Sequence, residues 1–355
     1  MSDRLLLPEL PGVLSAAQLQ QTVAAIAAEQ LPDGALPWSR TEQLDPWDSV
    51  EAAMALDVGG EHDRAAAAYG WLAGRQRPDG SWAAEYRAGR ATAPAAESNH
   101  AGYLAVGVWH HWLSTADEAF VVRLWPVVRR ALDLVSAMQL PTGAVSWALR
   151  PDGSPDDTAL LTGNASLYQA LRCGIALAGL CGRPQPAWDL AADDLQTALR
   201  SRPEAFADRS RYSMDWYYPV LAGAVTGPAA DDRLAAGWDT FVVPGLGVRC
   251  VADRPWVTGA ETCELALTLA AVGQPDAATE QVAAMQHLRA EDGSYWTGLV
   301  FADDARWPVE RTTWTAAAVV LAADAIAGTG PAAALFADPA ALLRPVGLPV
   351  RGREG

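Results

Sequence analysis

The sequence predicts an all-α protein, an (α/α)6 toroid in which six outer helices surround six inner ones. Three observations support this prediction: amphipathic segments alternate with segments that are apolar nearly all round, the alternation occurs six times, and runs typical of β-strands are scarce. A helix with its charges on one face covers a core, whereas a helix that is apolar on every side is buried within one. Each pair of segments therefore supplies one outer and one inner helix.

The twelve expected helices follow one another as outer–inner pairs. The first member of each pair is amphipathic, and the second is rich in Ala, Leu, Val and Gly with few charges after its first turn. In chain order, the outer helices are expected at 15–30, 62–76, 117–139, 187–201, 231–240 and 275–288. The inner helices are expected at 45–58, 97–114, 156–180, 214–225, 259–272 and 309–326. No break in composition divides the chain, so we expect one toroid domain over residues 1–343 and a short tail over 344–355.

The loops that lead from an outer to an inner helix repeat along the chain. The segment 30–38, Gln-Leu-Pro-Asp-Gly-Ala-Leu-Pro-Trp, resembles 76–82, Gln-Arg-Pro-Asp-Gly-Ser-Trp, and looser copies occupy 139–147 and 286–296. An Asp-Gly pair makes a tight turn after a helix. Because Trp is highly buried on average, we expect the Trp residues of these loops to be mainly structural.

Composition and charge limit the classes of function. The chain of 355 residues has 26 Lys and Arg against 42 Asp and Glu, a net charge of −16, so neither nucleic acid nor an anionic membrane is an expected partner. The longest apolar stretch, 316–327, is too short to span a bilayer. The four cysteines form no Cys-x-x-Cys pair, and the N-terminus lacks the pattern of a secretory signal. We therefore expect a cytoplasmic protein with buried thiols and without a disulfide framework or zinc site.

Two motifs resemble those of isoprenoid enzymes. Trp71-Leu-x3-Gln76-x3-Gly80-x-Trp82 resembles the glutamine–tryptophan motif of squalene-hopene cyclases and protein prenyltransferases, which share this toroid. Asp156-Asp157-Thr158-Ala159 resembles the acid motif of class II terpene cyclases, with Ser154 in place of its first Asp. The zinc ligands of protein prenyltransferases are absent. The resemblance implies a cyclase-like or prenyltransferase-like enzyme in which Asp156 or Asp157 is the general acid.

A second resemblance is to glucoamylases and related six-hairpin glycosidases. Residues 116–120 and 124–132 resemble the helix of that family with its Trp-Pro pair, and Trp109-His110 fit the end of the preceding inner helix. Residues 312–317, Thr-Thr-Trp-Thr-Ala-Ala, resemble a stretch near the end of glucoamylases. The segments occur in the family's order, but its Glu-Gln base motif is missing and Thr297 lies near the expected place. This resemblance implies hydrolysis of glycosides.

The starts of the six inner helices carry the candidate site residues. In such a toroid these starts meet at one mouth, and each contains a carboxylate, in four cases with a Trp nearby. Asp and Glu also cap helix N-termini, so a structural role is the alternative for each. We expect catalysis by Glu310 and Asp215, with Asp157 and Glu261 in reserve. The expected substrate-binding residues are Trp47, Asp48, Glu51, Glu97, Asn99, His100, Asp156, Trp216, Tyr217, Trp256, Glu264, Trp296, Trp307 and Arg311.

These residue types suit sugars, because Trp faces stack on pyranose rings while carboxylates, Asn and Arg bond to hydroxyls. Cleavage of an acetal needs one protonated carboxyl as general acid and a second carboxylate as base or nucleophile. We therefore favour a glycan-active, glycoside hydrolase-like enzyme with a two-carboxylate mechanism, acting on a small glycoside or an oligosaccharide. The alternatives are the terpenoid cyclase or prenyltransferase-like enzyme and a non-catalytic toroid that binds a saccharide or a protein.

No cofactor is expected, because no glycine-rich phosphate-binding loop opens a helix. No transition-metal site is expected either, since the sequence has no His-x-x-His or paired Cys. A calcium ion held by loop carboxylates, the identity of the sugar and the oligomeric state stay open at this point.

Overall fold

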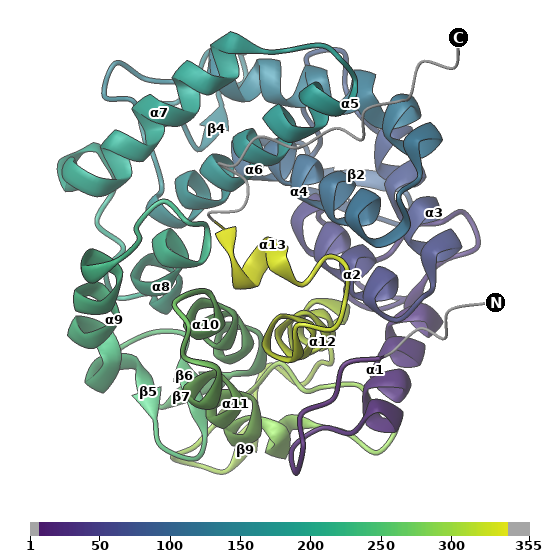
Figure 1. Cartoon of the computed structure of the whole chain (residues 1–355), viewed down its shortest axis with the longest axis vertical. Coiled ribbons are helices and arrows are strands. Elements are labelled where there is room, and N and C mark those ends of the chain that lie inside the picture. Colours follow the sequence, from purple (N-terminus) through teal and green to yellow (C-terminus); the bar gives the residue numbers. More distant parts are fainter. Residues whose placement is uncertain (1–6, 340–355) are drawn as a thin grey trace, which may run out of the picture.

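A computed structural model describes residues 7–339 of the chain. Its helices form two concentric rings, which confirms the predicted (α/α)6 toroid (Figure 1). The six inner helices are α2 (Pro46–Val58), α4 (Ser98–Thr115), α6 (Leu161–Leu180), α8 (Ser213–Leu221), α10 (Gly259–Ala271) and α12 (Thr313–Ala327). Neighbouring inner helices contact one another around the ring, and α12 closes it against α2. Burial explains their composition: all 13 residues of α2 are buried.

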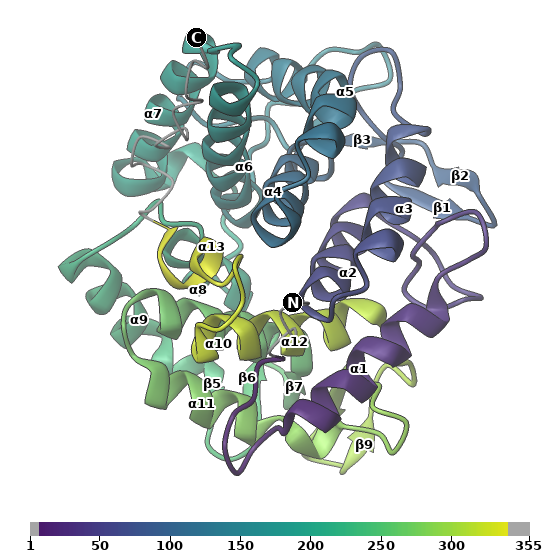
Figure 2. The same cartoon turned by 45° about the vertical axis from the view of Figure 1, so that its right-hand side comes forward.

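The outer ring alternates with the inner one along the chain and lies at the periphery in both views (Figures 1 and 2). It consists of α1 (Ala16–Glu29), α3 (His62–Ala73), α5 (Glu118–Ala137), α7 (Pro186–Ser201), α9 (Pro228–Phe241) and α11 (Pro275–Ala284). Each outer helix buries one stripe. In α7, for example, Trp188, Ala192 and Leu195 are buried while Asp189 and Asp193 are exposed. This one-sided burial is the physical origin of the amphipathic pattern.

Two inner helices begin later than predicted. The expected helix 156–180 begins at Leu161, because the Oδ1 atom of Asp156 accepts a hydrogen bond of 2.8 Å from the backbone N–H of Thr158 and closes a turn there. The expected helix 309–326 begins at Thr313, where the Thr312 side chain caps it. Asp156, Asp157 and Glu310 therefore lie in loops ahead of the helices.

Nine short strands lie in the described part of the chain, more β-structure than the sequence indicated. Each has two to four residues, which is too short to leave an alternating pattern. The pairs are β1 (Glu85–Arg87) with β2 (Arg90–Ala93) and β3 (Ala96–Glu97) with β4 (Ala148–Leu149). An antiparallel sheet joins β5 (Val242–Val243), β6 (Gly247–Arg249), β7 (Trp256–Thr258), β8 (Gly298–Val300) and β9 (Ala305–Arg306) in that order. It holds together the loops that lead into α10 and α12.

The repeated loops fasten neighbouring outer helices to each other. The Gln76 side-chain amide donates to the carbonyl of Gly80 in its own turn (3.1 Å) and to that of Val127 in α5 (2.9 Å). Gln30 and Gln139 make the equivalent pairs of bonds. Gly80 has a φ of 95°, and a Cβ atom there would lie 2.3 Å from the carbonyl oxygen of Arg130. The repeated glutamine and glycine are thus explained by the hydrogen bonds and the close backbone contact that link neighbouring outer helices.

The end of the ring opposite the inner-helix starts is covered by α13 (Ala334–Ala337), which contacts α10 and α12 and lies over the ring centre in Figure 1. Two short 3-10 helices, Pro203–Ala205 and Gln286–Leu288, complete the described structure. The predicted domain boundary at residue 343 and the tail 344–355 lie outside the described residues. Within residues 7–339, no helix is both long and apolar enough to cross a membrane.

Candidate active site

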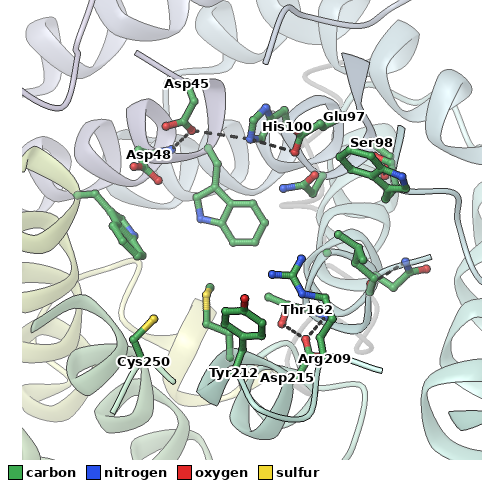
Figure 3. Close-up of a pocket in the computed structure, with 18 of the residues that line it drawn as sticks. Asp45, Asp48, Glu97, Ser98, His100, Thr162, Arg209, Tyr212, Asp215 and Cys250 are labelled. Carbon is green, nitrogen blue, oxygen red and sulfur yellow. Dashed lines mark hydrogen bonds and ion pairs between the residues drawn. The ribbon is translucent and has the colours of Figure 1, made fainter. Parts of the chain in front are cut away.

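The loops and first turns that begin the inner helices enclose a pocket of about 330 Å³, which we call the central pocket (Figure 3). Its walls come from the starts of five inner helices and from the loops before them. The lining residues are Trp38, Asp45, Trp47, Asp48, Glu97, Ser98, Asn99, His100, Trp147, Leu160, Thr162, Gly163, Asn164, Arg209, Tyr212, Met214, Asp215, Cys250 and Trp314. The structure thus brings together at one mouth segments that are far apart in the sequence.

Six of the predicted site residues line the central pocket: Trp47, Asp48, Glu97, Asn99, His100 and Asp215. The predicted residues that are buried and do not line it include Glu51, Tyr217, Glu261 and Glu264. Among them, Glu51 bonds to the pocket residue Trp47.

The remaining predicted residues do not line the central pocket. Asp157 points to solvent with 91% of its side chain exposed and pairs with Arg150, and Asp156 is partly exposed beside it. Trp216 packs outward, donating to the backbone carbonyl of Arg233 on α9 (2.8 Å).

Five of them are not in the pocket because the five-stranded sheet directs their loops elsewhere. Trp256 and Trp307 form an edge-to-face pair on the sheet, with ring centroids 4.7 Å apart. Trp296, Glu310 and Arg311 line a separate groove beside α1. The pocket geometry lends no support to a catalytic role for Glu310 or Asp157.

Several lining residues were not predicted from the sequence. Trp38 and Trp147 are the last residues of the repeated loops and were expected to be mainly structural. Trp82 of the same repeat is indeed in the core, 1% exposed, with its indole N–H bonded to the backbone of Leu72. Because Trp82 holds the same place in its repeat and is buried, the repeat does not reveal which Trp reaches the mouth. For Arg209, Tyr212 and Cys250, no motif in the sequence marks the site.

Asp48 is held in the pocket wall by the first turn of α2. The N-cap residue Asp45 accepts the backbone N–H of Asp48 (2.9 Å) with one carboxylate oxygen and the indole N–H of Trp38 (2.7 Å) with the other. The Asp48 carboxyl has no cationic partner among the described residues. Burial, together with the charges of Asp45 and Glu51, raises the pKa of Asp48 well above its usual value. The surroundings of Asp48 therefore favour its protonated form.

Asp215 lies on the other side of the pocket from Asp48, beside Tyr212 and Arg209 (Figure 3). Its Oδ1 atom accepts the hydroxyl of Thr162 at 2.5 Å and the backbone N–H of Thr162 at 3.2 Å. Burial raises the pKa of Asp215, while the bonds from Thr162 and the charges of Arg209 and Arg233 act in the opposite direction. The surroundings of Asp215 thus favour the ionised form more than those of Asp48 do.

A buried layer of carboxyls and phenols supports the pocket from below. Glu51 Oε1 accepts the indole N–H of Trp47 (2.9 Å) and the hydroxyl of Tyr103 (3.0 Å), and the Trp47 and Tyr103 rings stack at 4.5 Å. Burial raises the pKa of Glu51 to about 7. Glu264 accepts the hydroxyl of Tyr217, and burial together with the charge of Glu51 raises its pKa as well. This layer fixes the ring of Trp47 and places ionisable carboxyls close to Asp48.

The fourth carboxylate of the pocket wall, Glu97, lies at the start of α4. The Nε2 atom of His100 lies 3.8 Å from Glu97 and 3.9 Å from Asp45, so the imidazole bridges two carboxylates. No three His, Cys, Asp or Glu side chains within residues 7–339 are arranged to hold a metal ion. The surroundings of Asp48 favour the protonated form more than those of Asp215 do, and aromatic rings lie beside both, which suits acid–base cleavage of an acetal.

The fold is one that solved toroid glycosidases share. Solved structures with this fold include a glycosidase variant in complex with glucose, with a TM-score of 0.72 and 15% identity, which covers 88% of this chain and 96% of that one. A rhamnosidase from Klebsiella oxytoca with rhamnose bound has a TM-score of 0.65 and 17% identity, with coverage of 90% and 65%. A mannosylglycerate hydrolase from Thermus thermophilus in complex with glucose has a TM-score of 0.63 and 14% identity, with coverage of 85% and 99%. At this identity the likeness shows the fold alone.

A sequence relative gives the family. The chain is 54% identical over 348 residues to the MMP endo-(1,4)-3-O-methyl-alpha-D-mannosidase of Mycolicibacterium hassiacum, covering 98% of this chain and 94% of the relative. The chain belongs to the family of this mannosidase and is a glycoside hydrolase. No protein-family model matches it.

These findings decide between the three functions considered from the sequence. The glycan-active enzyme is confirmed, and so is the resemblance to six-hairpin glycosidases. The resemblance to prenyltransferases and terpenoid cyclases receives no support. Its glutamine–tryptophan motif is explained by the hydrogen bonds of Gln76, which link neighbouring outer helices. Its acid pair, Asp156 and Asp157, lies outside the pocket.

Proposed function

We propose that this protein is an endo-acting hydrolase that cleaves internal α-1,4 linkages in a polysaccharide of 3-O-methylmannose. One observation carries the proposal: the 54% identity to an endo-(1,4)-3-O-methyl-α-D-mannosidase extends over 98% of the chain. The relation therefore includes every segment that lines the central pocket.

The lining of the pocket is consistent with a methylated sugar. Several aromatic or apolar side chains, among them those of Trp38, Trp147, Met214 and Trp314, face the same space as the carboxyls. A methyl ether replaces a hydroxyl donor with an apolar group, so it gains from contact with such side chains instead of requiring a hydrogen-bond partner. The remaining hydroxyls can bond to Asn99, which also lines the pocket.

Asp48 is the proposed general acid. It is the pocket carboxyl whose surroundings most favour the protonated form, with burial as the main cause and negative neighbours as the second. The acid must give its proton to the glycosidic oxygen as the bond to the anomeric carbon breaks. The raised pKa of Asp48 favours the protonated form that a general acid requires.

Asp215 is the proposed second carboxyl, which activates water or attacks the anomeric carbon. Thr162 orients one of its oxygens, and Arg209 and Arg233 favour its ionised form. Glu261 is the competing candidate, because it is buried and bonds to Cys250, which lines the pocket.

The test is the product pattern of the purified protein on 3-O-methylmannose polysaccharide. We expect the chain length to fall quickly, with oligosaccharides forming before any monosaccharide accumulates, and slower cleavage of unmethylated α-1,4-mannan. Release of single residues from one end would contradict endo action. Equal cleavage of both polymers would contradict recognition of the methyl group, and the absence of cleavage would overturn the proposed substrate.

A further inference from the structure

We propose that a second groove, separate from the central pocket, is a distal binding site for the same saccharide chain. The groove has a volume of about 620 Å³ and lies between α1 and the loop that leads into α12. We call it the α1–α12 groove. This inference rests on the proposed function, because it assigns the groove to a neutral, partly methylated polysaccharide.

The central pocket and the groove share one thin wall. The backbone N–H and the hydroxyl of Thr313 donate to the carbonyls of Trp38 and Pro37, both at 2.8 Å. On each side of this seam, consecutive residues face different cavities: Trp38 and Trp314 line the central pocket, while Ser39 and Thr313 line the groove. A saccharide chain that leaves the central pocket across these Thr313 hydrogen bonds therefore reaches the groove directly.

An endo-acting enzyme needs such an extension. It binds sugar residues on both sides of the bond that it cleaves, whereas a pocket of about 330 Å³ is at the small end of ligand sites. The groove supplies further volume next to the pocket without a change in the fold.

The groove carries the chemistry of a saccharide site. Trp296 is partly exposed in it, and the guanidinium of Arg311 lies over its ring, 5.2 Å from the centroid. Arg311 is in turn held by Asp292 (2.8 Å) and the Ser294 hydroxyl (2.9 Å). The aromatic ring is therefore preorganised, with charged hydrogen-bonding groups around it.

The charge of the groove selects against other polymers. Four carboxylates, those of Glu29, Glu42, Asp292 and Glu310, line it against one cation, Arg311. A polyanion would be repelled by this lining and by the net charge of −16. The neighbouring Val309 has 80% of its surface exposed, which offers an apolar contact for methyl ethers. A neutral chain that has both hydroxyl and methoxyl groups fits this combination.

The experiment measures binding and cleavage separately. The background is Asp48→Asn, because loss of the proposed general acid should suppress cleavage. Calorimetry then gives the Kd of the intact methylmannose polysaccharide and that of a short methylmannose oligosaccharide that fills only the pocket. Trp296→Ala should weaken binding of the polysaccharide by about 10-fold, the size expected for one aromatic contact, and change the Kd of the short oligosaccharide less than about 2-fold. Trp296→Phe should restore most of the loss.

A matched control removes a Trp at the other end of the ring. Trp112→Ala, near the C-terminus of α4, should change neither Kd, provided that both variants show cooperative thermal unfolding. Equal weakening of the short and long ligands by Trp296→Ala would overturn the distal site, as would no weakening of either, or no binding of the polysaccharide by the background protein. If Trp296 governs binding of the polysaccharide but the wild type does not cleave it, the proposed function fails while the binding site stands.

Discussion

Replacing Glu51 by Gln tests how the buried carboxyl layer under the pocket holds its protons. The Glu51 side chain is 3% exposed, and its Oε1 atom accepts bonds from Trp47 and Tyr103. The amide oxygen of a Gln side chain can accept the same two bonds, so the substitution removes the ionisable group while keeping its shape. The effect on stability therefore reports the protonation of Glu51.

The magnitude follows from the pKa. Burial moves the pKa of Glu51 from an ordinary 4.5 to about 7, and one pKa unit corresponds to about 1.4 kcal/mol. Ionising Glu51 in the folded protein thus costs about 3 kcal/mol relative to the unfolded chain. The folded state holds the proton more tightly, so this contribution is fully present below pH 4.5 and is lost as the pH rises to about 7.

The assay is urea unfolding of the wild type and of Glu51→Gln between pH 4.5 and pH 8, the range that brackets the two pKa values. The free energy of unfolding of the variant, minus that of the wild type, should rise by about 3 kcal/mol across this range. Glu9→Gln, on an exposed side chain, controls for the loss of one acidic group. Parallel curves of stability against pH for Glu51→Gln and wild type would contradict the raised pKa of Glu51, because they would mean that its pKa is the same in the folded and unfolded states.

Two further predictions concern the core and the second carboxyl. Trp82→Ala should lower the free energy of unfolding by about 3–5 kcal/mol, as for other buried aromatics, since Trp82 is 1% exposed and bonded to the backbone of Leu72. A variant with native stability in urea unfolding would contradict the structural role of Trp82. Asp215→Asn should lower kcat by at least about 100-fold and Glu261→Gln by much less, as measured by the release of reducing ends; the reverse order would transfer the role of the second carboxyl to Glu261.

The fold was predictable because burial leaves a signal along the whole chain. The six repeats of an amphipathic and an apolar helix are a direct consequence of two concentric rings, and α2 and α7 show the two patterns in their simplest form. The exact helix starts were less predictable, because the side-chain bond from Asp156 to Thr158 and the cap at Thr312 act over only two or three residues.

The site was predictable in part. Asp215 was predicted to be catalytic and Asp48 to bind substrate because the starts of inner helices meet at one mouth, and both line the central pocket. Glu310 met the same criterion, yet it lies in the α1–α12 groove, because its backbone pairs with Thr297 and its loop runs on the far side of the Trp38–Thr313 seam. Whether a residue such as Glu310 faces the central pocket or the groove depends on long-range contacts, which a single sequence does not reveal.

Asp48→Asn removes the proposed general acid. Loss of a general acid lowers the rate by about 100- to 10,000-fold. The fold should be retained, because the amide carries no charge and removes an ionisable group whose charged form is opposed by burial and by Asp45 and Glu51. With the methylmannose polysaccharide as substrate, we predict that kcat falls by at least about 100-fold while the temperature of unfolding stays equal to that of the wild type or rises. A folded Asp48→Asn variant that cleaves the polysaccharide at close to the wild-type rate would contradict the assignment of Asp48 as the general acid.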